Sequence, residues 1–152
     1  MKIVVTGGAG FIGSHVVDRL LAGGHEVICL DNFDPYYSPE IKQANVVQGL
    51  DNKNFKLVKG DIRDWGLIKR ILSEEGIEYI IHEAAQAGVR ASVRDPKKVH
   101  EVNTTGTLNI LEAALNSNVK KIVNASSSSV YGKVEYLPFD EEHPKNPVSP
   151  YG

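Results

Sequence analysis

Three glycines spaced three residues apart constrain this chain more than any other feature of its sequence. Gly7, Gly10 and Gly13 follow an apolar run at residues 3–5 and open a segment with helical apolar spacing, residues 11–21. A strand, a glycine turn and a helix in this order allow the backbone to approach a diphosphate, because glycine carries no side chain. The free N–H groups and positive dipole end of the helix would then face the phosphates. A purely structural turn is the alternative, but the flanking strand and helix favour dinucleotide binding.

Composition and charge narrow the class of protein. The 152 residues are 41% hydrophobic and 24% charged, which suits one soluble domain with its own core. A net charge of −2 predicts no general attraction to nucleic acid or to an anionic membrane. The single cysteine, Cys29, and the lack of a signal-like start or of an apolar run of about 20 residues predict a cytoplasmic protein. The histidines show no ligand spacing, so we expect no metal site.

Strands and helices are expected to alternate along most of the chain. This alternation predicts an α/β fold of the Rossmann type, a doubly wound parallel sheet with helices on both faces. Ligands in such sheets bind beyond the carboxyl ends of the strands. Further strands are predicted at residues 26–30, 55–59, 77–82 and 119–125, and further helices at residues 39–50, 64–75 and 95–116.

Five segments that each follow a predicted strand are expected to converge on one crevice. They are residues 7–13, 31–32, 61–62, 82–89 and 126–129. Asp31 ends the second strand, where its carboxylate could accept hydrogen bonds from ribose hydroxyls and repel a 2′-phosphate. That position favours NAD over NADP, although Asp31 and Asn32 could also simply begin a turn. Asp61 could hold the adenine edge, cap the following helix, or do both. Ala84 and Ala85 are small where the backbone would pass close to a cofactor.

Four serines follow the strand predicted at residues 119–125, and a histidine ends the strand predicted at residues 77–82. Residues 126–129 are four consecutive serines, which could form a flexible linker or a hydrogen-bonding wall, and their place after a strand favours the wall. No Gly-x-Ser-x-Gly pattern surrounds them, so nucleophilic serine chemistry is not expected. His82 is expected to be a packed strand-end residue. With Glu83 it resembles the start of the zinc motif His-Glu-x-x-His, but Gln86 occupies the second histidine position.

Taken together, these motifs resemble the extended short-chain dehydrogenase/reductase superfamily, in particular its NAD-dependent nucleotide-sugar epimerases and dehydratases. The likeness extends over the whole chain. The segments that carry it are residues 6–15, 31–32, 60–64, 82–85, 103–107, 126–132 and 149–152.

The resemblance implies NAD as the cofactor and a UDP-sugar as the substrate. In this family a tyrosine removes a proton from a sugar hydroxyl while NAD accepts a hydride from the same carbon; an epimerase then returns the hydride to the other face. Tyr151 matches that base, and Ser127 matches the hydroxyl that steadies the reacting oxygen, with Ser128 as the fallback. The residues that the resemblance places at the cofactor are Gly7, Gly10, Phe11, Ile12, Gly13, Asp31, Asn32, Asp61, Ile62, Ala84, Ala85, Gln86 and Asn103.

The resemblance leaves the sugar open. Residues 86–90 and the aromatic loop at residues 34–37 resemble UDP-glucuronate 4-epimerases, and Arg90 could meet a substrate carboxylate. Microbial UDP-glucose 4-epimerases carry similar segments, so a UDP-hexose 4-epimerase is the first expectation. A UDP-glucuronate 4-epimerase or an NDP-sugar 4,6-dehydratase is the alternative. The expected substrate-binding residues are Ser127, Ser128 and Arg90.

The chain also departs from the family pattern. It ends at Gly152, before the lysine of the Tyr-x-x-x-Lys motif and before a substrate domain. We therefore expect residues 1–152 to be an incomplete NAD-binding domain, an N-terminal half that binds NAD but epimerises poorly or not at all. A non-catalytic NAD-binding module is the alternative from another class. Family members usually form homodimers through two long helices, and residues 95–116 would supply one.

Overall fold

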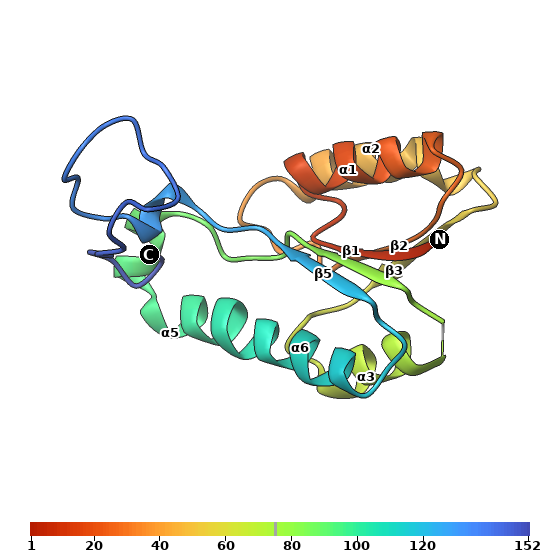
Figure 1. The fold of residues 1–152 in the computed structure, drawn as a ribbon. Coiled ribbons are helices and arrows are strands. Elements are labelled where there is room, and N and C mark those ends of the chain that lie inside the picture. Colours follow the sequence, from red (N-terminus) through yellow and green to blue (C-terminus); the bar gives the residue numbers. More distant parts are fainter. Residues whose placement is uncertain (75) are drawn as a thin grey trace.

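The fold is built on a single parallel sheet of five strands. A computed structural model describes residues 1–74 and 76–152. The strands lie in the order β3-β2-β1-β4-β5, and each neighbouring pair is parallel (Figure 1). Their bounds are Lys2–Thr6 for β1, Glu26–Asp31 for β2, Phe55–Lys59 for β3, Tyr79–His82 for β4 and Lys121–Asn124 for β5.

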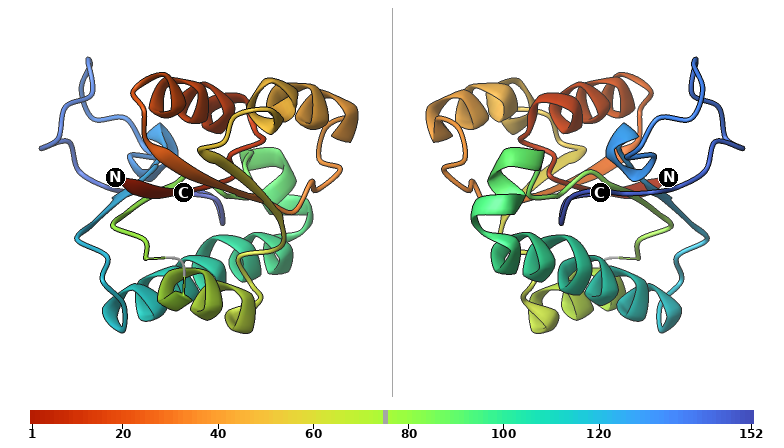
Figure 2. Two further views of the ribbon diagram at one scale, coloured as in Figure 1. Left: turned by 90° about the vertical axis from the view of Figure 1, so that its right-hand side faces the viewer. Right: turned by 90° about the vertical axis from the view of Figure 1, so that its left-hand side faces the viewer.

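Helices cover both faces of this sheet, which confirms the predicted fold class. Helices α1 and α2 lie on one face and α3 and α6 on the other, as the two side views show (Figure 2). The strands β1 and β2 are apolar and buried on both sides because helices cover both faces. The bounds are Phe11–Ala22 for α1, Pro39–Leu50 for α2, Trp65–Glu74 for α3 and Thr107–Leu115 for α6.

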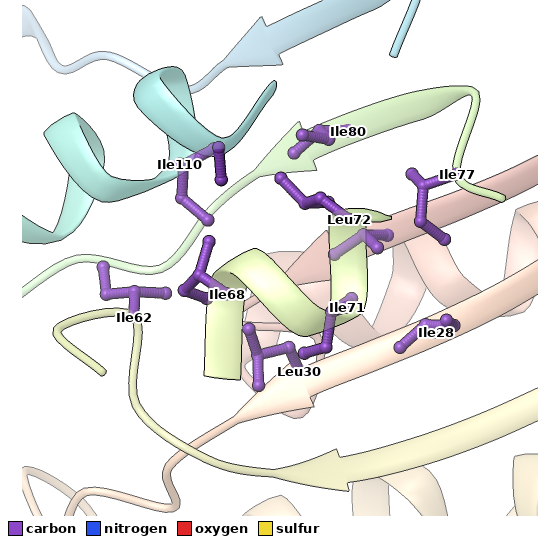
Figure 3. Close-up of a cluster of buried hydrophobic side chains, with 11 residues drawn as sticks. Ile28, Leu30, Ile62, Ile68, Ile71, Leu72, Ile77, Ile80 and Ile110 are labelled. Atoms are coloured by element: carbon purple, nitrogen blue, oxygen red, sulfur yellow. The ribbon is translucent and has the colours of Figure 1, made fainter. Parts of the chain in front are cut away.

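Alternate residues of the same strands supply two separate cores. Val4 and Ile28 point to the α3 and α6 side, where they join a cluster made largely of isoleucine and leucine (Figure 3). Val5 and Cys29 join the cluster on the α1 and α2 side, which Val17 of α1 completes. The two-residue period of a strand thus divides one apolar run between two helix layers.

The long helix predicted at residues 95–116 is not uniform. It consists of α5, Pro96–Val99, then a π-helical segment η1, His100–Gly106, and then α6. A separate helix α4, Val89–Arg94, precedes it and was not predicted. The side chain of Asp95 accepts a hydrogen bond from the N–H of Lys98 (3.0 Å) and so caps α5, as expected.

The remaining predicted elements differ mainly at their ends. The fourth and fifth strands are shorter than predicted, and the predicted end of the third helix at residue 75 lies outside the described residues. Asp64 caps α3 through the N–H of Leu67 (3.0 Å). Beyond β5 the chain forms a short 3-10 turn η2, Ser128–Val130, and a loop in which Tyr131 and Phe139 pack against the buried His143.

Candidate dinucleotide-binding site

A cavity of about 300 Å³ opens beyond the carboxyl ends of β1, β2 and β4. The strand order reverses at this place, because β1 is followed by β2 on one side and has β4 on the other. Such a reversal separates the loops after neighbouring strands and leaves a crevice. Among the residues that the resemblance placed at the cofactor, the ones that line the cavity are Gly7, Gly10, Phe11, Ile12, Gly13, Asp31, Asn32, Asp61, Ile62, Ala84, Ala85 and Gln86.

Steric contacts explain why the first and the last positions of the glycine turn are both glycine. Gly7 has a φ of +68°, a conformation that L side chains rarely adopt, and a Cβ there would lie 2.8 Å from the backbone nitrogen of Ala84. A Cβ at Gly13 would overlap the carbonyl of Gly7. Glycine therefore brings β1, the start of α1 and the loop after β4 into direct backbone contact.

The start of α1 has backbone N–H groups without a helical acceptor beside the cavity. Gly10 is the N-cap and provides no side-chain cap, and the first helical bond runs from the N–H of Ser14 to the carbonyl of Gly10 (2.9 Å). The N–H groups of residues 11–13 come before that bond, so they have no acceptor within the helix. All three residues line the cavity. Together with the helix dipole they form a site suited to an anion.

Asp31 is buried and holds the turn after β2. Its Oδ2 accepts from the N–H of Ala9 (3.2 Å) and its Oδ1 from the N–H of Phe33 (2.8 Å). The ammonium of Lys42 in α2 lies 3.3 Å from the same Oδ1. Asp31 thus begins a turn and also lines the cavity, and its contact with ribose hydroxyls stays a prediction. Lys42 was not predicted from the sequence to belong to the site.

Asp61 is fixed by charged and amide donors instead of by the helix that follows. Its Oδ2 accepts from Asn32 Nδ2 (2.8 Å) and from Arg63 Nη2 (2.8 Å), and its Oδ1 accepts from the N–H of Arg63 (2.9 Å). The Arg63 guanidinium holds the pKa of the Asp61 carboxyl well below its usual range, so the carboxylate stays ionised. The cap of α3 is Asp64, so Asp61 serves the cavity edge.

His82 ties three elements together beneath the loop after β4. Its Nδ1 lies 2.6 Å from Thr6 Oγ1 of β1, and its Nε2 lies 3.0 Å from Thr107 Oγ1 of α6. Burial lowers the pKa of His82 from 6.5 to about 4, so the ring is neutral near pH 7. Thr6 Oγ1 also accepts from the N–H of Ala84 (3.2 Å). His82 therefore fits the packed strand-end interpretation.

Asn103 does not line the cavity. It lies in the π-helical segment, where its Oδ1 accepts from the N–H of Gln86 (2.7 Å) and its Nδ2 donates to the carbonyl of the same residue (3.1 Å). One amide side chain thus satisfies both backbone groups of Gln86. Asn103 positions a residue that lines the cavity, which is an indirect role toward any ligand there.

The residues expected to carry chemistry lie outside the cavity lining. Figure 1 shows residues 126–152, drawn in blue, beyond the carboxyl-terminal end of the sheet. Ser127 Oγ accepts from the N–H of Ser129 (3.2 Å) and caps η2, and Ser128 is exposed. Tyr151 is half-buried in the last loop, and Arg90 is exposed in the first turn of α4.

Across residues 1–74 and 76–152, no helix combines the length and the apolar character needed to cross a lipid bilayer. Within the same residues, no three side chains of the metal-binding types gather closely enough to hold an ion.

A glycine turn, an uncapped helix start and a crevice at the reversal of a parallel sheet define a Rossmann-type dinucleotide-binding fold. A family model described as GDP-mannose 4,6 dehydratase matches residues 4–152. The chain therefore belongs to the GDP-mannose 4,6 dehydratase family, as the sequence resemblance to nucleotide-sugar epimerases and dehydratases predicted.

The similar proteins include UDP-glucose 4-epimerases and a dTDP-glucose 4,6-dehydratase. The chain is 46% identical to a putative UDP-glucose 4-epimerase of Methanocaldococcus jannaschii, over 99% of this chain and 46% of the relative. It resembles the UDP-glucose 4-epimerase of Thermus thermophilus solved with NAD (42% identity, TM-score 0.86, 99% of this chain and 46% of that one). It also resembles the dTDP-glucose 4,6-dehydratase DesIV of Streptomyces venezuelae solved with NAD (38% identity, TM-score 0.89, 99% and 47%). The chain spans about half the length of these relatives.

Proposed function

We propose that this chain forms the NAD-binding part of a nucleotide-sugar 4-epimerase that acts on a UDP-hexose. The observation that supports NAD binding is the uncapped start of α1, where residues 11–13 line the cavity and their N–H groups have no acceptor within the helix. The relatives named as UDP-glucose 4-epimerases support the substrate class.

The residues around the cavity fit a dinucleotide along its length. The N–H groups of residues 11–13 would donate to the diphosphate, where glycine leaves room for it. Asp31 would accept from the ribose hydroxyls of the adenosine. Asp61, held ionised by Arg63, would accept from the adenine amino group. Acidic side chains at the ribose end favour NAD over NADP because a 2′-phosphate adds negative charge there.

The chemistry of the reaction requires a proton acceptor beside the bound cofactor. NAD, when bound, supplies a reversible hydride acceptor. Tyr151 would remove the proton from the sugar hydroxyl, and a free tyrosine needs positive neighbours to do so because its pKa is about 10. Ser127 would hold the reacting oxygen, since its Oγ is fixed by the N–H of Ser129 and its hydroxyl, which donates to Ser129 Oγ (3.3 Å), would turn to the sugar. His82 takes no part, because it is buried and neutral.

We also propose that two copies of the chain associate through α6. Leu108, Leu111 and Leu115 are exposed on this helix and recur at a spacing that places them along one side. An exposed apolar row of this kind is typical of a protein interface. The same helix is the one that the family resemblance assigns to the homodimer.

A charge placed at the start of α1 tests the proposed diphosphate site. Ile12 is exposed at the cavity, so Ile12→Glu keeps the helix, whose dipole favours an acid in the first turn. The new carboxylate would repel the diphosphate, and we expect NAD to bind at least about tenfold more weakly. Isothermal titration calorimetry with NAD measures this change.

Two matched variants separate charge from size and from position. Ile12→Gln has nearly the same size without the charge and should bind NAD within about threefold of the original chain. Ile41→Glu places the same charge in the first turn of α2, where Ile41 is similarly exposed and does not line the cavity. Equal NAD affinity in Ile12→Glu and the original chain would refute the proposed diphosphate position.

A further inference from the structure

The cavity contains a buried cation to which the proposed function gives no role. The side chain of Lys42 is only 9% exposed, and its Nζ lies 3.3 Å from Asp31 Oδ1 and 5.2 Å from the centre of the Tyr37 ring. Among the described residues that line the cavity, Lys42 is the only lysine or arginine. The acidic side chains that line it are Asp31, Asp34, Asp61 and Glu83.

Lys42 is not needed to orient Asp31. Two backbone N–H groups, from Ala9 and Phe33, already bind the two carboxylate oxygens. Burying an ammonium group costs free energy that one ion pair seldom recovers in full. The hydroxyl of Tyr37 is also buried, and it lies against the backbone of Phe11. Both polar groups lie between Asp31 and the start of α1, where a dinucleotide would pass.

The neighbouring acids are largely neutralised by other partners. Asp34 pairs with Lys98 at 3.0 Å, and Asp61 pairs with Arg63 at 2.8 Å. Glu83 lies on the loop after β4 and is the remaining acid at the cavity. The charges of Asp31 and Lys42 thus nearly cancel, and each charge can be removed by a separate substitution.

We propose that Lys42 is a second specificity-determining residue for the adenosine ribose, a cation able to bind a 2′-phosphate that Asp31 masks. This inference rests on the proposed dinucleotide site. A free 2′-hydroxyl can donate to the Asp31 carboxylate, whereas a 2′-phosphate meets that carboxylate as a like charge. Removal of the Asp31 charge leaves the Lys42 ammonium buried and available to a phosphate. The preference for NAD is therefore a balance between two opposite charges.

Titration of NAD and NADP into four forms of the chain tests this balance. The forms are the original chain, Asp31→Asn, Lys42→Met and the double variant. We expect the ratio of the NADP to the NAD dissociation constant to fall about tenfold or more in Asp31→Asn and to return in the double variant. Lys42→Met alone should raise the ratio. Lys97→Met, which removes an equal charge from a lysine outside the cavity that is 87% exposed, should leave the ratio unchanged.

The outcomes distinguish this inference from the proposed function. Equal ratios in Asp31→Asn and the double variant would overturn the role of Lys42, while NAD binding by the original chain would keep the proposed cofactor. Failure of the original chain to bind either dinucleotide would overturn the proposed function and this inference together. If circular dichroism shows that Asp31→Asn does not fold, Lys42→Met decides alone, and an unchanged ratio there refutes the inference.

Discussion

His82 is a buried polar residue whose two ring nitrogens both have hydroxyl partners. Thr6 and Thr107 hold the ring between β1 and α6, where burial keeps the imidazole neutral near pH 7. A proton added to the ring would place a charge in the core, where burial makes the charged form unfavourable. The residue therefore links the pH of the solution to the packing beneath the loop after β4.

The stability of the chain should depend on pH through His82. Its pKa is about 4 in the folded chain and about 6.5 when unfolded, so the unfolded state binds the proton first as pH falls. The contribution of His82 is complete above pH 6.5 and is lost between pH 6.5 and about 4, a change of about 3 kcal/mol in the free energy of unfolding. Urea unfolding at a series of pH values measures it.

A variant isolates this residue from the carboxylates that also titrate in acid. His82→Gln keeps one donor and one acceptor but cannot gain a charge near neutral pH. We expect its free energy of unfolding to fall less than that of the original chain between pH 7 and pH 4.5. Parallel pH profiles of the two proteins would show that His82 carries no such linkage.

Residues at strand ends could be foreseen from the sequence, but their partners could not. Asp31 follows an apolar strand directly, and the Rossmann arrangement places such a residue at the crevice. Lys42 lies in the first turns of a helix that shows no clear apolar pattern. Its contact with Asp31 depends on how the loop between them folds, and no local spacing records that.

At the scale of elements, the helical stretch from α5 to α6 differs most from its prediction. Helical periodicity detects the apolar face, but it does not detect one extra residue in a turn, so the π-helical segment was missed. That segment carries Asn103, whose amide holds both backbone groups of Gln86. The six residues of α4 were missed because they are too few to show a period.

The exposed row on α6 makes a prediction about association. Leu111 is the central leucine of the row, and Leu111→Lys places a charge where a partner helix would pack. We expect the original chain to sediment as a dimer at high concentration and the variant to sediment as a monomer. Val47→Lys, at a similarly exposed site on α2, should leave the dimer intact. Sedimentation of the original chain as a monomer at every concentration would contradict the proposal.

For the whole molecule, the order of the strands determines where the loops meet. The alternation of strands and helices was enough to predict the parallel sheet and its two helix layers. The turn at Gly7 was also predictable, because only glycine combines its φ with so close a contact to the next loop. The serine segment was predicted to reach the crevice because it follows a strand, but it does not line the cavity. Its position and that of Tyr151 depend on loops without a period, which local spacing does not record.

The central claim is that the start of α1 holds the diphosphate of NAD. Amide chemical shifts recorded by NMR during an NAD titration test it most directly. We predict the largest shifts at the N–H groups of residues 11–13, with further shifts at Asp31 and in the loop at residues 84–86. A second pocket lies along α1 and includes His15 and Arg19 in its lining. Shifts confined to these two residues, or no shift at saturating NAD, would contradict the claim.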